Sequence, residues 1–502
     1  MPTPIFPHAL SRSTLVASDV APARGELMAI GVLRARVIAA APLWSLAAAL
    51  AYVVSPLNFW ILFRHTDWLD TYTDRTDLAL AAAPALGLLA IGAAAALAIG
   101  RERAIAAAWA GPLAKAIWLF TAMGILSGIY GITRHNSPEL VLSDFLPIAE
   151  LFGFFFLAVN AVRSEADARI VGVGIVASLA ATILIRIYFF IPAVDTLPQL
   201  AAGFTHGLPG TGVTALFVIG RVMPRLPLLQ AAAWIVPFAL GYAISGSSAR
   251  LRLTAAIASG LSIVAVYLSF ERGLWLFAAV GVAFVLVEGL RSTRFRWPAA
   301  RSAVAGVTIA LAAYTAIAVV IRAEPSTTAL DRLGYTFVQV NSNVPLAHKR
   351  QDETAGITQV LSSYSRPRSA FQLVVGGGLG ATYIGPTGIL ETTYEAQAHE
   401  VKHYTFDTYL GTVLRMGVIG EIGLGIWVAI FLAYGLASWW RGQNRVIRML
   451  GAASIGALLG VALMSFVDPY LLAHPITIFE GVLAAALVRV APRMPWHRKG
   501  AI

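Results

Sequence analysis

Two histidines and a glutamate in the last third of the chain have the spacing of a zinc-binding motif. His399, Glu400 and His403 lie within EAQAHEVKHYTFDTYLGTVLRMGVIG, residues 395–420, and fit the pattern H-E-x-x-H. On a helix this spacing places both imidazoles on one face to hold zinc, while the glutamate activates water. A membrane zinc metalloprotease is therefore one interpretation of this segment.

A hydrolytic zinc site also needs a third protein ligand and an open coordination position. The acidic candidates downstream form no local ligand pattern; they are Asp407, Glu421, Asp468 and Glu480. If residues 399–415 form a helix, Asp407 lies one turn after His403 on the same face. Arg415 then lies deeper, where we expect it to pair with an acid on a neighbouring span. These polar groups can therefore serve a site other than a zinc centre.

The elements that must position these groups are membrane helices. Hydrophobic residues make up 58% of the chain and charged residues 13%, whereas soluble domains have about 45–50% apolar and about 25% charged residues. Apolar runs of about 20 residues, enough to cross the hydrocarbon core as helices, recur along the chain. Helices satisfy their backbone hydrogen bonds internally, as lipid requires. We therefore expect an all-α polytopic membrane protein.

The net charge of +11 does not indicate a nucleic-acid partner. Lysine and arginine lie mostly in short connections between apolar runs, where they orient the helices with their basic ends in the cytoplasm. The chain contains no cysteine, which excludes disulfides and thiolate ligands and is compatible with an oxidising compartment. We expect membrane lipids as partners, no nucleic acid and no cofactor.

About twelve spans are expected, with both termini in the cytoplasm. They lie near residues 38–63, 77–99, 113–133, 140–162, 168–191, 208–245, 253–270, 273–290, 302–321, 408–437, 449–467 and 474–490. The segment 208–245 is long and contains prolines, so it is either one broken helix or a re-entrant pair with one net crossing. The expected organisation is a flexible cytoplasmic tail (1–26), nine spans (27–321), a large periplasmic loop with short helices (322–405), three spans (406–490) and a basic cytoplasmic tail (491–502).

The hairpin between the seventh and eighth spans carries charges at its outer end. Glu271 and Arg272 lie in YLSFERGLWLFAAV, between two apolar runs. An arginine at this place either extends to lipid head groups from a simple turn or faces an anionic substrate. If the substrate carries phosphate, arginine suits it better than lysine, because guanidinium binds phosphate bidentately.

The expected loop contains an amphipathic helix followed by a glycine-rich turn. In LAHKRQDETAGITQVLSSYSRPRSAFQLVVGGGLGATYIG, we expect the helix to start at Arg350 and to end before SRPRSAF. The residues at helical spacings after Arg350 are Glu353, Ile357, Val360 and Leu361. The run GGGLG lacks the Lys-Ser/Thr of a phosphate-binding loop, so its glycines are expected to permit tight packing near the bilayer and close approach of a ligand.

In their order along the chain, these motifs resemble the bacterial O-antigen ligase and O-antigen polymerase superfamily of membrane glycosyltransferases. The resemblance covers residues 208–437 by motif. SFERGLW with Arg272 resembles a Ser-Arg-Gly-like hairpin, HKRQDETAGITQVL with Arg350 an Arg-led loop helix, and VVGGGLGAT a G-x-G-x-G turn. FDTYLGTVLRMGVIG keeps four residues of the segment that closes the family's loop, namely Tyr409, Leu410, Gly417 and Gly420.

The resemblance implies a GT-C-like, metal-independent glycosyltransferase in the bacterial inner membrane. Such an enzyme transfers a glycan from an undecaprenyl-pyrophosphate carrier to a glycan or glycolipid acceptor at the periplasmic face. Arg272 and Arg350 would stabilise the departing pyrophosphate. The further substrate-binding candidates are Glu353, Tyr409 and Arg186, and the candidate partners of Arg186 within the membrane are Asp144 and Glu150.

Two residues, His403 and Asp407, are candidates for the catalytic base. In register with Tyr409, the family's His-Asn pair falls on Phe406 and Asp407 in this chain. Either His403 reaches the same point from the preceding turn, or Asp407 takes over the role. Both are candidate catalytic residues, because an imidazole with a pKa of about 6.5 or a carboxylate can accept the proton of the acceptor hydroxyl. The aspartate favours a polysaccharide polymerase over an O-antigen ligase that transfers glycan to lipid A core.

A transporter or flippase also has about twelve spans and intramembrane charges. Such proteins commonly contain repeated halves with matching broken helices. The chain shows no such internal symmetry, and its segment 322–405 is long for simple alternating access. Glycan transfer is therefore the function that the sequence favours.

Overall fold

The computed structural model describes residues 38–54, 75–164, 166–167, 170–175, 177–179, 227–246, 248–268, 272–291, 345–364, 370–384, 401–402, 407–466, 471–472 and 476–490. Among them helices dominate, and one antiparallel pair of two-residue strands completes the regular structure. The expected span 302–321, the first half of 208–245 and both expected tails lie outside the described residues.

Most of the described helices are long and apolar. Their bounds are Ile38–Val53, α3 (Arg75–Ala108), α4 (Gly111–Thr133), α5 (Pro138–Ala161), α8 (Pro227–Ser245), α9 (Ala249–Leu268), α10 (Arg272–Arg291), α13 (Pro345–Tyr364), α14 (Ala370–Val375), α15 (Thr408–Arg441), α16 (Arg445–Met464) and α17 (Ile476–Val490). Seven helices of the described chain have the length and composition to cross a membrane, namely α3 from Ala83 on, α4, α5, α9, α10, α15 and α16. The expected helical, multi-pass architecture is confirmed at this level.

Small residues let the helices approach one another closely. A Cβ atom at Gly481 of α17 would overlap the backbone of α5. On α16, a Cβ atom at Gly456 would lie 2.8 Å from the Cα atom of Gly281, and one at Gly460 would lie 2.8 Å from the ring of Phe277. Close contact of this kind drives helix association in lipid, which is itself as apolar as the side chains.

α10 and α16 run antiparallel. Phe277, in the second turn of α10, faces Gly460, in the last turns of α16. At the other end of the pair, Arg448 Nε lies 3.0 Å from Glu288 Oε1, and Trp439 donates its indole N–H to Glu288 Oε2 at 2.9 Å. This register fixes which ends of the two helices meet.

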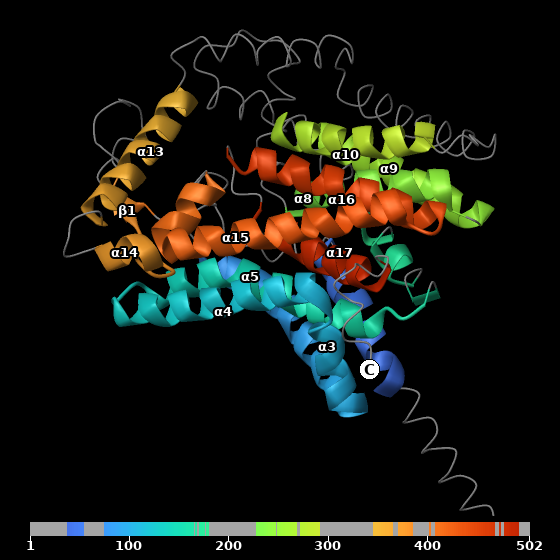
Figure 1. Ribbon diagram of the computed structural model, residues 1–502, viewed down its shortest axis with the longest axis horizontal. Helices are drawn as coiled ribbons and strands as arrows, with labels where there is room; N and C mark the ends of the chain where they lie inside the picture. Colours follow the sequence, from blue (N-terminus) through green and yellow to red (C-terminus); the bar gives the residue numbers. More distant parts are fainter. Residues whose placement is uncertain are drawn as a thin grey trace, which may run out of the picture.

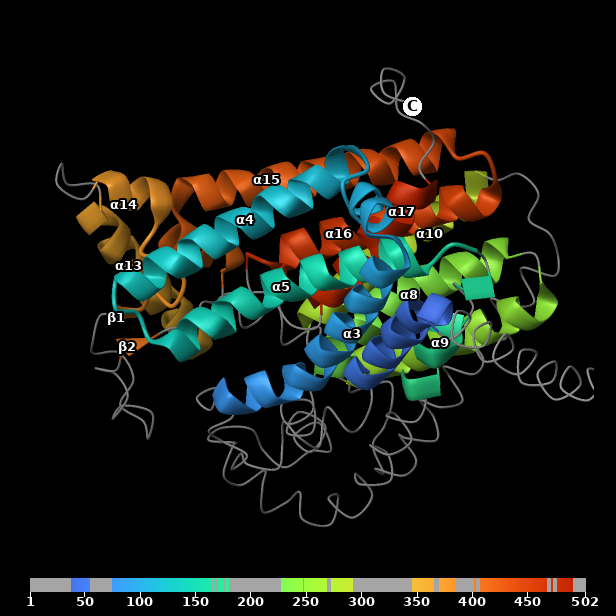
Figure 2. The ribbon, with the colours of Figure 1, turned by 90° about the horizontal axis from the view of Figure 1, so that it is seen from below.

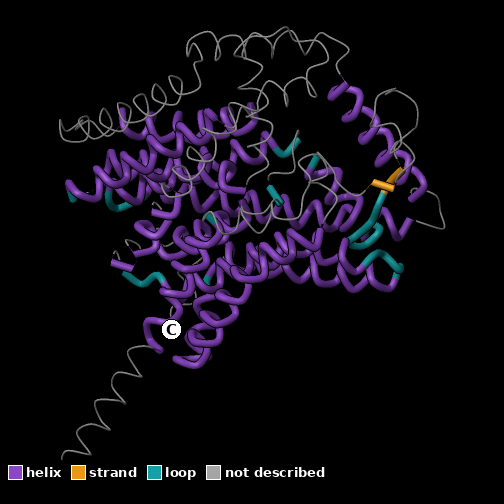
Figure 3. Tube along the Cα trace, turned by 180° about the vertical axis from the view of Figure 1, so that it is seen from behind, coloured by secondary structure: helices purple, strands orange, loops and turns teal. Residues whose placement is uncertain are grey.

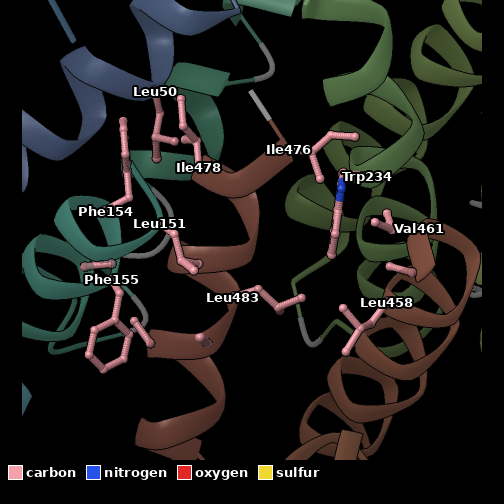
Figure 4. Close-up of a cluster of buried hydrophobic side chains, with 14 of the residues drawn as sticks. Leu50, Leu151, Phe154, Phe155, Trp234, Leu458, Val461, Ile476, Ile478 and Leu483 are labelled. Atoms are coloured by element: carbon pink, nitrogen blue, oxygen red, sulfur yellow. The ribbon is translucent and has the colours of Figure 1, made fainter. Parts of the chain in front are cut away.

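One large apolar core holds the bundle together. Figure 4 shows buried side chains around α17, including those of Leu50, Leu151, Phe154, Phe155, Trp234, Leu458 and Val461. They come from the first described helix, α5, α8 and α16. Since each dispersion contact is weak, it is their number that stabilises the packing. The core gives α5, α16 and α17 fixed positions from which a site can be built.

A module of short elements covers one end of the bundle. α13, α14 and the glycine-rich turn lie beside the end of α4, the start of α5 and the first turns of α15 (Figures 1 and 2). The strands β1 (Tyr383–Ile384) and β2 (Val401–Lys402) pair antiparallel beside them (Figure 3). We call this end of the bundle the loop end.

α13 is the amphipathic helix that the sequence predicts, with one correction. It begins at Pro345 rather than at Arg350, and it ends at Tyr364. Proline is favourable in the first turn because the N–H it lacks has no helical partner there. Ile357 is fully buried in a cluster with Ala381, Tyr383 and Leu414, and Val360 and Leu361 pack against that cluster. The predicted apolar face of α13 is therefore confirmed.

Candidate functional site

α15 is broken in its third turn. Gly417 has φ 69° and ψ −171° and separates a short segment, 408–416, from the long part of the helix. The short segment folds back beside the start of the long part (Figure 1), where the carboxyl groups of Asp407 and Glu421 interact electrostatically. A straight helix would separate these two residues by about 21 Å. The break therefore brings the start of α15 back into the bundle.

A second glycine holds this break. Gly376 of the glycine-rich turn has φ 79° and crosses α15 at Gly417. A Cβ atom on Gly376 would overlap the carbonyl group of Arg415, and one on Gly417 would overlap the carbonyl group of Val374. Residues with side chains do not fit at such a crossing. The expectation that the GGGLG glycines permit tight packing is thereby confirmed.

Asn136 ties the glycine-rich turn to the connection between α4 and α5. Its Nδ2 donates to Gly377 O at 3.1 Å and to Leu379 O at 2.9 Å. Leu379 N donates to Ser127 O at 3.1 Å, and Ser127 Oγ donates to Arg415 O at 2.9 Å. The turn is thus hydrogen-bonded to α4 and to the connection between α4 and α5, and α4 is hydrogen-bonded in turn to α15. Sequence reasoning missed Asn136 and Ser127, because a single polar residue near the end of a span belongs to no motif.

The expected helix over residues 399–415 is wrong in its first half. Residues 401–402 form β2, and the helix begins only at Thr408. The motif residues His399, Glu400 and His403 lie outside the described residues. The zinc interpretation depends on a helix, and the described residues within the motif, 401–402, form a strand instead. Within the part of the chain that the structure describes, no three side chains of His, Asp or Glu gather as a metal site.

Asp407 caps α15. Its Oδ1 accepts hydrogen bonds from Tyr409 N at 2.8 Å and from Leu410 N at 3.1 Å, as the side chain at an N-cap does. Burial raises the pKa of the Asp407 carboxyl group above its ordinary value, and the two N–H groups partly oppose this rise. A half-buried carboxylate that is more basic than usual is suited to accept a proton. Of the two candidate bases, Asp407 is the one whose surroundings are described.

Tyr409 fastens the start of α15 to the end of α16. Its hydroxyl donates to Ala462 O at 2.8 Å, and its ring packs on Phe466 with the centroids 4.5 Å apart. The backbone of Thr408 adds a hydrogen bond to Ser465 O at 2.9 Å. These contacts position Asp407, the residue just before them. The direct contact of Tyr409 with substrate stays a prediction.

Arg415 pairs with an acid on a neighbouring helix, as the sequence predicts. Its Nε lies 2.9 Å from Asp144 Oδ2, and Gly380 N donates to the same oxygen at 2.7 Å. The two side chains are 16% and 10% exposed, so the pair is largely buried. Asp144 was also a candidate partner of Arg186, which lies outside the described residues. The pair joins α5, the glycine-rich turn and the broken part of α15.

Replacing Asp144 by alanine is expected to destabilise the loop end, because it removes the carboxylate that faces the Arg415 charge. Breaking one partner of a buried pair costs about 3–5 kcal/mol, whereas apolar replacement of both partners is often neutral. The midpoint of thermal unfolding in detergent should therefore fall for Asp144→Ala and rise again for Asp144→Leu combined with Arg415→Met. A double variant no more stable than the single one would contradict this account.

The start of α10 lies level with the start of α15. Phe277 faces Gly460 of α16, and Arg272 precedes Phe277 by 277 − 272 = 5 residues, or about 7.5 Å along the helix. Ser465 follows Gly460 by the same number of residues, 465 − 460 = 5, in the antiparallel helix, and it accepts the hydrogen bond from Thr408 N. Arg272 and Thr408, which are far apart in the sequence, thus lie at the same height along α16.

For three of the predicted substrate-binding residues, the structure describes the backbone but not the side chain. Arg272 is the first residue of α10, while Arg350 and Glu353 belong to α13, whose apolar face packs on Leu410 and Leu414 of α15. The side chains of these three residues are not described, and neither is any part of His403. Their convergence on one ligand therefore stays a prediction.

Two further acids lie near Tyr409. The carboxyl groups of Asp407, Glu421 and Glu480 each act electrostatically on the Tyr409 phenol. Glu421 follows the break in α15, and Glu480 belongs to α17. The sequence marked them only as candidate zinc ligands. Their position within apolar helices is the signal that could have identified them, because ionisable residues in the membrane are costly and commonly functional.

No protein-family model matches the chain, and no curated protein is significantly similar to it. What the site can do follows from its chemistry. It offers a partly buried carboxylate at the start of α15 and an arginine at the start of α10 on the same level. Such a set can bind an anion and accept a proton.

Proposed function

We propose that the protein is a membrane glycosyltransferase of the O-antigen polymerase type. It polymerises undecaprenyl-pyrophosphate-linked oligosaccharide at the periplasmic face of the bacterial inner membrane. In this proposal about twelve spans cross the membrane with both termini in the cytoplasm. Residues 322–405 form the periplasmic loop, and the loop end of the bundle is the outer end.

The observation that carries the proposal is the placement of Asp407. The break at Gly417 turns the start of α15 back, and the hydrogen bond from Thr408 N to Ser465 O holds it against the end of α16. Because α10 is antiparallel to α16, Arg272 begins its helix on this same level. This placement supports the roles proposed here for Asp407 as proton acceptor and for Arg272 as anion ligand, both of which glycan transfer from a pyrophosphate needs.

The proposed reaction is a substitution at the anomeric carbon, in which nothing is oxidised or reduced. The acceptor hydroxyl oxygen attacks the anomeric carbon, and its proton passes to Asp407 or His403. The bond from the anomeric carbon to the carrier breaks, and its electron pair leaves on the pyrophosphate. Arg272 and Arg350 stabilise the negative charge that develops there, while Glu353 and Tyr409 help to hold the substrates. Arg186 is assigned a secondary binding role.

An alternative acceptor would change the product of the proposed reaction but not its chemistry. An O-antigen ligase would use the same residues to transfer the glycan to lipid A core. The aspartate at position 407, in place of the His-Asn pair, favours the polymerase. The strand at 401–402 opposes the metalloprotease, and no feature of the described residues favours a transporter or flippase.

Asp407→Asn is expected to lower the transfer rate about 10²- to 10⁴-fold, the range that general base catalysis supplies. Asparagine caps a helix about as well as aspartate, so thermal stability should be unchanged. The rate is measured with purified protein and a synthetic undecaprenyl-diphosphate glycan, by the appearance of longer lipid-linked glycans.

Asn444→Ala is a matched control, because Asn444 caps α16 through Ile447 N at the end of that helix away from Ser465. It should lose about 1 kcal/mol of stability and keep the transfer rate. His403→Ala tests the other candidate base. Wild-type rates in both Asp407→Asn and His403→Ala, or no glycan product from the wild-type protein, would count against the proposal.

A further inference from the structure

Glu480 of α17 is a buried acid that has no partner among the described residues. Its relative exposure is 0%, and neither of its carboxyl oxygens has a hydrogen-bond partner among the described residues. An isolated ionised carboxylate in an apolar interior costs far more free energy than a folded protein can offset, so such a group is neutral. Glu480 therefore carries its proton.

A second carboxyl group, that of Glu421, acts on the phenol of Tyr409. Glu421, like Glu480, acts electrostatically on Tyr409, and its Oε2 is buried without a hydrogen-bond partner in the described part of the chain. Asp407 acts both on Tyr409 and on Glu421. Three acids thus act on the phenol: one that is fully buried, one that is partly buried and the one that caps α15.

No ion pair found among the described residues joins a basic side chain to this group of acids. Arg415, which lies between Tyr409 and Glu421 in sequence, is paired with Asp144. α5, which packs against α17, adds a further buried acid, Glu150, whose Oε2 accepts from Thr477 Oγ1 at 3.2 Å. A proton, rather than a basic side chain, is therefore the means by which Glu480 avoids buried charge.

The other described helices that contact α17 supply no cation at this level. α8 has no charged residue. The described cations of α16 lie in its first turn, where Arg448 pairs with Glu288, and Lys115 lies in the second turn of α4. Both positions are at the end of the bundle opposite the loop end, because α4 and α16 both run towards the loop end.

We propose that Glu480 and Glu421 form an internal proton site beside Tyr409, linked to the loop end through Asp407. Glu480 holds its proton in the resting protein, and Glu421 exchanges a proton with Asp407. The use of the site rests on the proposed function: when the acceptor hydroxyl gives its proton to Asp407, an ionised Glu421 takes that proton up. The proton on Glu480 does not depend on that function.

Infrared difference spectra of the purified full-length protein test the proton on Glu480. The spectrum of wild type minus Glu480→Gln should contain the C=O stretch of a neutral carboxylic acid. Glu288→Gln is the matched control, because Glu288 is 2% exposed but bonded to Arg448 and Trp439. Its difference spectrum should contain carboxylate bands alone. Glu480→Asp, which keeps the acid, should move the neutral-acid band without removing it.

Exchange through Asp407 is tested by transfer into D2O. Glu421→Gln should remove a second neutral-acid band, and the deuterium shift of that band should slow several-fold in Asp407→Asn. Carboxylate bands alone in the Glu480→Gln spectrum would overturn the proton site, and a shift equally fast in Asp407→Asn would overturn the link. Since these spectra involve no glycan, the proton site and the transferase activity can fail independently.

Discussion

Arg272→Ala is expected to abolish glycan transfer while the protein still inserts and folds. In the proposed reaction the pyrophosphate gains negative charge as its bond to the sugar breaks, and the guanidinium of Arg272 would stabilise that charge. Removing one such donor costs about 10²- to 10³-fold in rate, and removing an arginine that acts on a phosphoryl group costs about 10³- to 10⁵-fold. We therefore expect at least about a 10³-fold fall in lipid-linked product, measured with purified protein, and a similar fall for Arg350→Ala.

The position of Arg272 explains why this effect should be large. It begins α10, and the contact of Phe277 with Gly460 fixes the height of that helix against α16. A charge on a helix held in this way needs little reorganisation when the leaving group departs. Arg272→Lys keeps the charge but loses bidentate binding, so it should give an intermediate rate.

Arg291 supplies the matched control. It ends the same helix, and its guanidinium lies 5.8 Å from the centroid of the Trp439 ring. Arg291→Ala removes an equal charge at the end of α10 away from Asp407, and it should keep the transfer rate. If Arg272→Ala worked as fast as Arg291→Ala at equal amounts in the membrane, the leaving-group role of Arg272 would be wrong.

The two halves of the segment around Asp407 show how far sequence reasoning reaches. The start of α15 at Thr408 was predictable, because a capping aspartate precedes a long apolar run. The H-E-x-x-H pattern before it was misleading, because residue spacing carries a helical meaning only where the chain is helical. Pairing of β2 with β1, a contact between segments distant in sequence, decides the conformation there.

Charge pairing was easier to predict than backbone geometry. A partner for Arg415 was expected because an unpaired charge inside a membrane protein is costly, and Asp144 provides it. The break at Gly417 was not predicted, because a glycine inside an apolar run is compatible with a regular helix. Its conformation is set by the crossing with Gly376, and the return of Asp407 towards Glu421 follows from that break.

Gly417→Ala is expected to displace the start of α15, and with it Asp407. The φ of 69° and ψ of −171° fall in a region that is open essentially to glycine alone, so strain should cost about 1–3 kcal/mol. The added Cβ atom would also overlap the carbonyl group of Val374, and overpacking typically costs about 1–3 kcal/mol more. We therefore expect a lower midpoint of thermal unfolding in detergent together with loss of glycan transfer.

Gly425→Ala, eight residues further along α15 (425 − 417 = 8), is the matched control. A Cβ atom there would meet no atom within 4 Å, and alanine is favoured over glycine inside a helix by about 1 kcal/mol. Its stability should stay equal or rise, and its transfer rate should not change. Gly376→Ala should reproduce the Gly417→Ala defect from the other side of the crossing, and the double variant should lose less stability than the sum of the two. If Gly417→Ala were as stable and active as Gly425→Ala, the hydrogen bonds of Thr408 and Tyr409 to α16 would suffice to hold Asp407 in place, and the glycine crossing would serve packing alone.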